Sequence, residues 1–332
     1  MPVLSVPSVS SPPSNAWGLV QYCMQRVPGY DPSEYLRELN AEYVHVWEEI
    51  SKLYVLYFST VKVLTVVNPQ YSYDLMYNSD GALDQALSPR LYQIMRIRVQ
   101  PPSGGLYQTT KSMQLERPDF IAIGANQNST PTTTGPYYWV PYGRGNIVWG
   151  LPLATGTKLE IYYSFWPLLM TYLSNGTVSS SGTTVTGTDT TFTQILQPDM
   201  QAYLPATGGG NPEEVQMELV GGNNQVYRVQ SVKSDTELTL ATAPQVPFNA
   251  SPYVLAFLPD IPREHIRVIA SLTIVRLYSL LGDDNRVAEW MAIAANDVQM
   301  MKDSLMERQG QDPPMKIRFP YGIGRRNRTF MR

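Results

Sequence analysis

The side chains that could do chemistry are few and lie far apart in the sequence. The chain has one cysteine, Cys23, and two histidines, His45 and His265, so it can form neither an internal disulfide nor a Cys/His metal cluster. The carboxylate pairs Glu48-Glu49 and Asp283-Asp284 are adjacent, and adjacent residues on a helix do not face one another. The sequence contains no phosphate-binding loop, nucleophile elbow, HExxH motif or aspartate-rich metal loop. We therefore predict that the protein is not an enzyme and has no catalytic residue, cofactor or metal site.

The C-terminal segment, residues 311–332, has the composition of a docking peptide. It carries six basic residues and one acidic residue, whereas the whole chain has a net charge of −3. Aromatic side chains lie among the cations, and arginine together with aromatic residues is typical of interface hot spots. A solvated basic end and phosphate contact with nucleic acid are the two alternative interpretations. The predicted docking residues are Lys316, Arg318, Phe319, Tyr321, Arg325, Arg326, Arg328 and Phe330.

The composition indicates a folded protein with much uncharged surface. Apolar residues make up 43% of the chain and charged residues only 16%. The remaining Tyr, Thr, Gln and Ser surface suggests contact with other protein chains. No apolar run approaches the roughly 18 residues needed to cross a bilayer, and residues 1–14 lack the basic flank and apolar core of a signal peptide. We expect a protein that is made in the cytoplasm and has no membrane partner.

The N-terminal region, residues 1–60, has a helical pattern. Asp31 can cap a helix that has Pro32 at its first position, and Glu34 completes a capping box. A shorter helix precedes it. The apolar face of the longer helix is predicted to contain Leu36, Leu39, Tyr43, Val46 and Ile50.

The helical pattern returns in residues 258–310 as a hairpin of two helices. Pro262 lies near the start of the first helix, Gly282 ends that helix, and Asp283 or Asp284 caps the second helix. The first apolar stripe is predicted to contain Ile266, Ile269, Leu272, Leu277 and Leu280. The second is predicted to contain Val287, Trp290, Met291, Ala294, Val298, Met301 and Leu305. We expect these stripes to pack against the N-terminal helices, which would form one helical core.

Between the helical regions the hydrophobic period changes to two, which is typical of strands. Residues 61–171 read as an antiparallel β region. In "MRIRV" the side chains of Met95, Ile97 and Val99 are predicted to point to one face and the two arginines to the other. In "KLEIYYSF" the predicted inner face contains Leu159, Ile161, Tyr163 and Phe165.

Residues 172–257 read as a separate small β-sandwich or barrel. A hairpin is predicted around Ser234-Asp235, with Tyr227 and Val229 on one strand and Leu238 and Leu240 on the next. This module interrupts the chain between a strand that ends near residue 170 and a helix that begins near residue 259. We expect it to project away from the helical core. The predicted fold class is α+β, with a helical bundle core, an antiparallel β region, an inserted β-module and an extended C-terminal tail.

The order of these elements resembles the head-to-tail adaptor (connector) proteins of tailed bacteriophages. The resemblance depends on "LNAEYVHVWEEI", "KLEIYYSFWPLL" and "LGDDNRVAEW", and it covers roughly residues 14–170 and 259–310. The segments "TVTGTDTTFT" and "VYRVQSVKSDTELTLATAP" resemble small Ig-like β-domains of phage virion proteins. The module is a departure from the simplest members of the adaptor family.

The resemblance implies a structural virion protein at the neck of the phage. It implies a homo-oligomeric ring, commonly of twelve copies, and a repeated head-to-tail contact that closes on itself would form such a ring. The implied partners are the portal protein, a tail, nozzle or stopper protein below the ring, and double-stranded DNA that passes through without sequence-specific contact. The alternative is a tail or fibre-type protein that binds a glycan or receptor on the host surface, which "GPYYWVPYGRG" and the β-module suggest.

Overall fold

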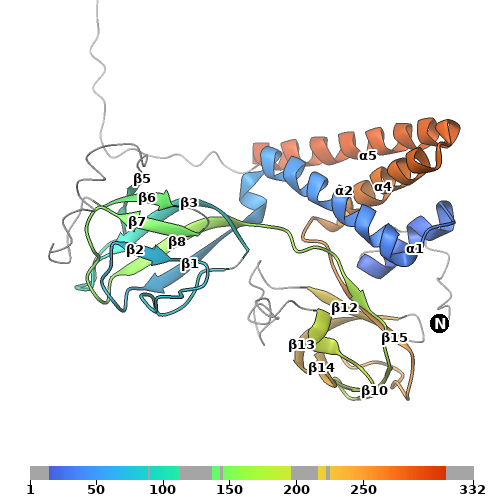
Figure 1. Ribbon diagram of the computed structural model, residues 1–332, viewed down its shortest axis with the longest axis horizontal. Helices are drawn as coiled ribbons and strands as arrows, with labels where there is room; N and C mark the ends of the chain where they lie inside the picture. Colours follow the sequence, from blue (N-terminus) through green and yellow to red (C-terminus); the bar gives the residue numbers. More distant parts are fainter. Residues whose placement is uncertain are drawn as a thin grey trace, which may run out of the picture.

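The computed structural model describes residues 15–88, 90–112, 137–142, 145–195, 216–221 and 225–311. The helices near the two ends of the chain pack together (Figure 1). We call this unit the helical core. It contains α1 (Ala16–Arg26), α2 (Pro32–Leu53), α4 (Ile266–Leu281) and α5 (Asp284–Gln311). The predicted α+β fold class, with a core built from both ends of the chain, is confirmed.

Capping signals in the sequence set the helix boundaries. The backbone N–H of Asp31 donates a hydrogen bond to the Glu34 carboxylate at 3.0 Å, as the capping box predicts. Gly282 ends α4 in the left-handed conformation, with φ of 71°. Asp283 then accepts a hydrogen bond from the backbone N–H of Arg286 at 3.1 Å, which caps α5. The hairpin therefore turns where the sequence predicts.

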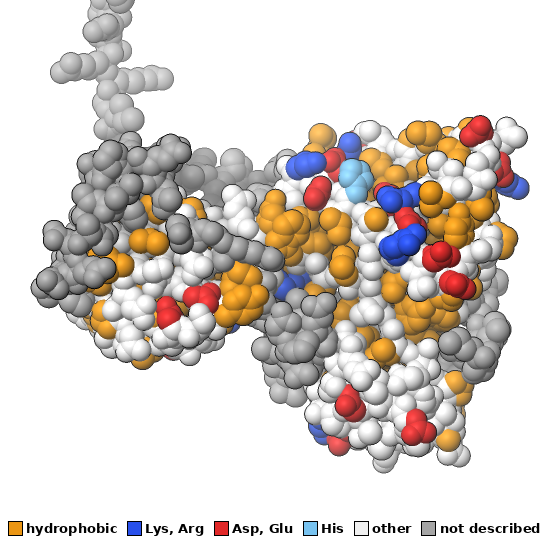
Figure 2. Space-filling model, viewed as in Figure 1, with side chains coloured by type: hydrophobic (Ala, Val, Ile, Leu, Met, Phe, Trp, Pro, Cys, Tyr) orange, Lys and Arg blue, Asp and Glu red, His pale blue; other side chains and the backbone are white. Residues whose placement is uncertain are grey.

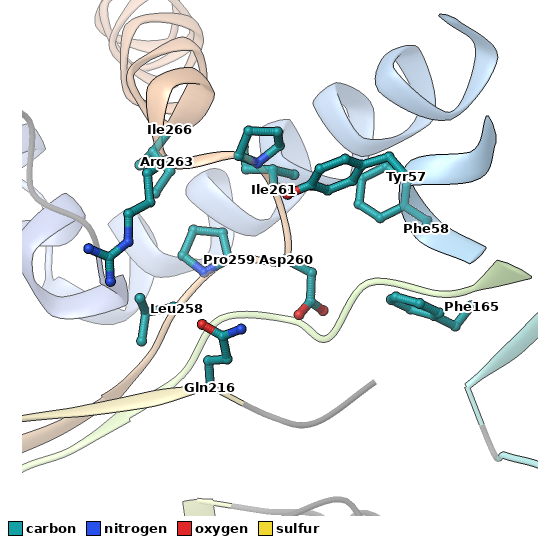
Figure 3. A pocket seen from close by; sticks show the side chains of 11 residues that line it. Tyr57, Phe58, Phe165, Gln216, Leu258, Pro259, Asp260, Ile261, Arg263 and Ile266 are labelled. Carbon is teal, nitrogen blue, oxygen red and sulfur yellow. The ribbon is translucent and has the colours of Figure 1, made fainter. Parts of the chain in front are cut away.

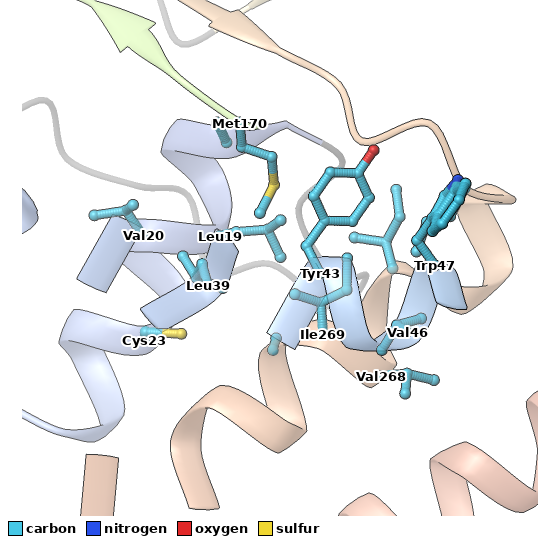
Figure 4. Packing of buried hydrophobic residues seen from close by; sticks show 14 of the residues in the cluster. Leu19, Val20, Cys23, Leu39, Tyr43, Val46, Trp47, Met170, Val268 and Ile269 are labelled. Atoms are coloured by element: carbon cyan, nitrogen blue, oxygen red, sulfur yellow. The ribbon is translucent and has the colours of Figure 1, made fainter. Parts of the chain in front are cut away.

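The apolar face of α2 lies at the centre of the helical core (Figure 4). Four of its five predicted residues are buried, and Leu36 packs against the cluster at its margin. The side chains of α1 and α4 complete the packing. Labelled members of this cluster are Leu19, Val20, Cys23, Leu39, Tyr43, Val46, Trp47, Met170, Val268 and Ile269.

The predicted stripes of the hairpin are wrong at two positions. Leu280 and Met291 are each 60% exposed. Hydrogen bonds tie α4 to the α1–α2 turn at Leu277 and Tyr278, and Leu280 lies beyond these contacts. Met291 lies in the second turn of α5, near the same end of the hairpin. Periodicity alone cannot show where the covering helices end.

The second unit, the sheet body, is a sandwich of two four-stranded sheets. One sheet has the order β1-β8-β3-β4 and the other β2-β7-β6-β5. Their inner faces share one hydrophobic cluster. The strands of the first sheet are β1 (Ser59–Thr65), β3 (Leu91–Gln100), β4 (Gln108–Thr109) and β8 (Lys158–Phe165); those of the second are β2 (Ser72–Asp74), β5 (Lys111–Ser112), β6 (Tyr138–Tyr142) and β7 (Asn146–Trp149). Its described strand pairs are antiparallel except for the parallel pair of β5 and β6.

The inner face predicted for β8 is confirmed for Leu159, Ile161 and Tyr163, which are buried in the cluster of the sheet body, whereas Phe165 is buried in the cluster of the helical core. On β3, Ile97 and Val99 are buried as predicted, but Met95 is exposed. The register with β8 shifts between Ile94 and Arg96, so Met95 is the extra residue of a β-bulge. The bulge interrupts the alternation that the sequence prediction assumed.

The third unit, the β-module, is one seven-stranded sheet with the order β10-β11-β14-β13-β12-β15-β9. The backbones of Val178 and Ser251 exchange two hydrogen bonds of 2.9 Å, so the sheet curls back on itself as a small barrel. A barrel is one of the two predicted forms. Its strands are β9 (Tyr172–Leu173), β10 (Thr177–Ser181), β11 (Thr184–Thr188), β12 (Met217–Gly221), β13 (Val226–Ser234), β14 (Glu237–Leu240) and β15 (Tyr253–Phe257).

Strand β15 joins the β-module to the helical core. Every residue of β15 is buried. Leu255 and Phe257 belong to the cluster inside the module, whereas Val254 and Ala256 belong to the cluster of the helical core. The module therefore packs against the helices along one side, while β10, β13 and β14 lie farther from them (Figure 1).

Candidate functional site: the junction of the three units

The eight predicted docking residues, Lys316 to Phe330, lie outside the described residues. The last described residue, Gln311, belongs to α5. The segment thus follows directly from a helix of the helical core. Docking by this segment stays a prediction.

The isolated chemical groups lie in separate parts of the helical core. Cys23 is buried in α1, and loss of hydration raises the pKa of its thiol to about 12, so it is not a nucleophile at neutral pH. His45 is exposed on α2, whereas His265 is buried at the start of the C-terminal hairpin. Within the described ranges, no group of three or more His, Cys, Asp or Glu side chains is arranged to hold a metal ion.

One carboxylate of each adjacent pair has a structural partner. Glu49 accepts a hydrogen bond from Lys52 at 2.8 Å, and this bond is the largest cause of a lowered pKa for the Glu49 carboxyl. Asp283 is the cap of α5. These contacts stabilise helix ends and helix surfaces, and they do not bring two carboxylates together.

A pocket of about 380 Å³ lies where the helical core, the sheet body and the β-module meet. Figure 3 shows Phe165, at the end of β8, on one side of it, and the segment from Leu258 to Ile261 across from it. Tyr57 and Phe58 come from η1 (Val55–Phe58), which leads from α2 into β1. The pocket therefore lies at the interface between the units.

A buried ion pair crosses this junction. Arg90, which is only 1% exposed, lies directly before β3, and its guanidinium Nη2 is 2.5 Å from Oδ2 of Asp260. Asp260 lies between β15 and α4. Arg90 also donates through Nε to the carbonyl oxygen of Trp166 at 3.0 Å, and its guanidinium lies 4.7 Å from the Phe165 ring centre. One arginine thus connects the sheet body, the linker after β8 and the segment that enters the C-terminal helices.

The partners of Asp260 extend this connection to α2. The backbone N–H of Asp260 donates to the hydroxyl of Tyr43 at 2.7 Å, and its carboxylate accepts from the backbone N–H of Leu168 at 3.2 Å. Burial raises the pKa of Asp260, and the neighbouring Arg90 opposes this shift. Burial also raises the pKa of Tyr43 well above its usual value. Tyr43 therefore remains a neutral hydroxyl.

Two more contacts hold the linker after β8 against α2. The side chain of Asn40 donates to the carbonyl oxygen of Met170 at 2.9 Å and accepts from its backbone N–H at 2.7 Å. The rings of Trp47 and Trp166 stack with centroids 5.4 Å apart, and Tyr92 of β3 meets Trp166 edge-on at 4.5 Å. These aromatic contacts fix the sheet body beside α2.

A second polar contact joins the β-module to the helical core. Glu218 of β12 is buried and accepts a hydrogen bond from the Asn15 side chain at 2.7 Å. Asn15 also caps α1 through the backbone N–H of Gly18 at 2.9 Å. Arg263 lies 3.5 Å from the same glutamate. The cap of α1 is therefore coupled to a strand of the module.

Sequence patterns missed these junction residues. Arg90 and Asp260 are separated by 170 positions, and Asn15 and Glu218 by 203. None of them belongs to a motif. The sequence around Asp260 shows only a charged residue beside a proline in a chain with few charges. This pattern does not predict which residue Asp260 pairs with.

The aromatic segment that suggested glycan binding is part of the sheet-body core in its described part. Tyr137, Trp139 and Val140 are buried. The indole N–H of Trp139 donates to the hydroxyl of Thr110 at 2.9 Å. These aromatic rings therefore pack inside the sandwich and do not form an open stacking surface.

No model of a known protein family matches the chain, and no curated protein is significantly similar to it. No helix among the described residues combines the length and the hydropathy of a membrane span. The junction therefore has to be interpreted from its own geometry. That geometry holds three units together, and its charged and polar groups are engaged in contacts between them.

Proposed function

We propose that this chain is a structural protein of a phage neck, an adaptor that assembles as a ring between the portal and the tail. The observation that carries the proposal is the single helical core built from both ends of the chain, from which a sheet body and a β-module branch. This is the element order of the adaptor resemblance. Arg90, Asp260 and Tyr43 hold the three units in one arrangement. A ring subunit needs such a fixed arrangement, because it has to position the proteins on either side of it.

In this proposal the C-terminal segment docks onto the portal protein. It follows α5, whose last described residue is Gln311, and its sequence contains six basic residues and several aromatic residues. Aromatic and arginine side chains form interface hot spots when they enter pockets of a partner. DNA would pass through the ring without being read, and the proposed site of action is the head-tail junction of the virion.

The mass of the native assembly is the first test. An adaptor ring predicts about a dozen copies of the chain, in a closed assembly whose mass does not grow with concentration. A trimer would contradict the ring and favour the fibre-type alternative. The burial of Tyr137 and Trp139 already removes part of the surface on which that alternative depends.

Deletion of residues 312–332 tests docking. We expect the truncated chain to keep its helical circular dichroism and to lose co-sedimentation with the portal protein of the same phage. A truncated chain that still binds the portal would contradict the docking role.

Two full-length variants separate docking from nucleic-acid contact. The first replaces Arg318, Arg325, Arg326 and Arg328 with glutamine, and the second replaces Phe319, Tyr321 and Phe330 with serine. Docking requires both sets for portal binding. Phosphate contact would require only the arginines, and its affinity for duplex DNA would fall steeply with salt.

A further inference from the structure

Two exposed surfaces lie at opposite ends of the molecule. The first, the hairpin-tip surface, surrounds the turn between α4 and α5 and consists of Leu280, Leu281, Asp283, Asp284 and Met291. Its three apolar side chains are between 53% and 60% exposed. Figure 2 shows acidic and hydrophobic side chains, with a basic one beside them, at this end of the helical core. Large apolar side chains that gather on one exposed surface, with charged groups beside them, mark a candidate interaction site.

The second, the sheet-face surface, is the outer face of the first sheet of the sheet body. It consists of Val61 and Val63 on β1, Arg96 on β3 and Lys158 on β8. Val61 and Arg96 both pair with Tyr162 of β8, and Val63 pairs with Glu160. Because Lys158, Glu160 and Tyr162 are alternate residues of β8, these side chains share one face. The two valines are 49% and 40% exposed, and both cations are exposed.

The charges of the two surfaces are opposite once local ion pairs are counted. At the hairpin tip, Arg286 pairs with Glu289 at 2.9 Å, which leaves Asp283 and Asp284. On the sheet face, Arg98 pairs with Glu160 at 2.6 Å, which leaves Arg96 and Lys158. One surface is therefore apolar and negative, and the other is apolar and positive.

The position of the surfaces decides what kind of contact they can make. Along the longest axis, the sheet body lies at one end and the α4–α5 turn at the other (Figure 1). They cannot meet within one chain in this arrangement. Two different surfaces that match each other across two copies form a heterologous contact, which closes into a ring or continues as an open array.

We propose that the hairpin-tip surface of one copy binds the sheet-face surface of the next copy. The occupant of each surface is thus a second copy of this chain. Apolar contact of the leucines and methionine with the valines supplies burial, and the opposite charges set the orientation and speed association. The inference rests on the proposed ring, because it names the contact by which successive copies are joined.

Charge exchange on the full-length chain tests the contact. Asp284→Lys gives the hairpin tip the sign of the sheet face, and Lys158→Glu does the reverse. Neither residue is the cap of α5, so the hairpin keeps its cap at Asp283. We expect each single variant to raise the concentration at which half of the chains assemble by about tenfold or more, and the combined variant to restore most of the loss. The assay is light scattering or analytical ultracentrifugation over a range of concentrations.

Matched variants control for charge alone. Asp303→Lys makes the same charge change on an exposed position of α5, and Lys233→Glu makes it on the β-module. Both should assemble like the unchanged protein. If Asp284→Lys and Lys158→Glu also assemble like the unchanged protein in a ring of normal mass, the contact is wrong and the adaptor proposal stands.

Other outcomes separate the two proposals further. Rescue by charge exchange within an open array or a small oligomer would support the contact and remove the adaptor ring. A chain that stays monomeric at every concentration would remove both. If Lys158→Glu instead abolishes salt-dependent binding of a duplex DNA fragment and leaves assembly unchanged, the sheet face is a DNA surface and the contact between copies is refuted.

Discussion

Replacing Arg90 with methionine should loosen the junction between the sheet body and the helical core. The side chain is buried, so the substitution leaves the Asp260 carboxylate without its counter-ion in a site that is only 12% exposed. Removing one partner of a buried ion pair costs about 3–5 kcal/mol. Methionine fills much of the volume of the arginine stem, so we expect a loss in the lower half of that range at neutral pH. Urea denaturation followed by circular dichroism and tryptophan fluorescence measures it.

The loss of unfolding free energy in Arg90→Met should depend on pH, and the direction of this dependence follows from the pKa of Asp260. Burial raises this pKa, and Arg90 opposes the shift, so removing Arg90 raises the pKa further. A folded-state pKa above the unfolded value means that the folded state holds the proton more tightly. Stability is therefore lost as the pH rises from the ordinary carboxyl range through the raised pKa. The deficit of the Arg90→Met variant should be largest near neutral pH and should shrink as the pH falls toward about 4.

Two further variants make this prediction sharp. Arg90→Met combined with Asp260→Asn removes both charges and should cost less than Arg90→Met alone. Arg263→Met makes the same substitution at a residue that, like Asp260, lines the junction pocket, but Arg263 is 72% exposed, so it should cost less than about 1 kcal/mol. If Arg90→Met costs no more than Arg263→Met, the buried pair does not hold the junction and the reasoning is refuted.

Three other perturbations test the structure around the junction. Gly176→Ala should destabilise the β-module by about 2 kcal/mol or more, because φ is +79° and a Cβ would lie 2.2 Å from the carbonyl oxygen of Thr188. Gly182→Ala has open space around it and should cost only about 1 kcal/mol of backbone strain. Thermal unfolding distinguishes the two variants. The thiol of Cys23 should react with a maleimide only when α1 opens, and rapid labelling of the native protein would contradict its burial. Asn15→Ala should cost about 1–3 kcal/mol in urea denaturation, since it removes the α1 cap and leaves a buried carboxylate on β12 with one partner fewer; an unchanged midpoint would show that this contact contributes nothing.

Local signals in the sequence predict the helices well. Around α2 the cap, the proline and the apolar stripe agree with one another, and agreement between levels is what makes a segment fold as its pattern indicates. The turn at Gly282 is equally well determined, because a left-handed residue followed by a cap can only end one helix and begin another. Strand β8 shows the same consistency.

The failures lie where a distant part of the chain decides the outcome. Met95 alternates correctly in the sequence, but a bulge against β8 moves it to the surface. Strand β15 has no alternation at all, since it is covered on both faces, and a short apolar run does not reveal its neighbours. The pair of Arg90 and Asp260 depends on three units meeting, which no local pattern encodes.

The double burial of β15 bears on how the protein would respond to a load. A force applied to the β-module would be transmitted through β15 to the helices that pack against its other face. The barrel therefore cannot separate from the helical core without exposing the hydrophobic cluster of that core. Removal of the module together with β15 would take Val254 and Ala256 out of the helical packing and leave a cavity there. The helical core therefore depends on the module for part of its own packing.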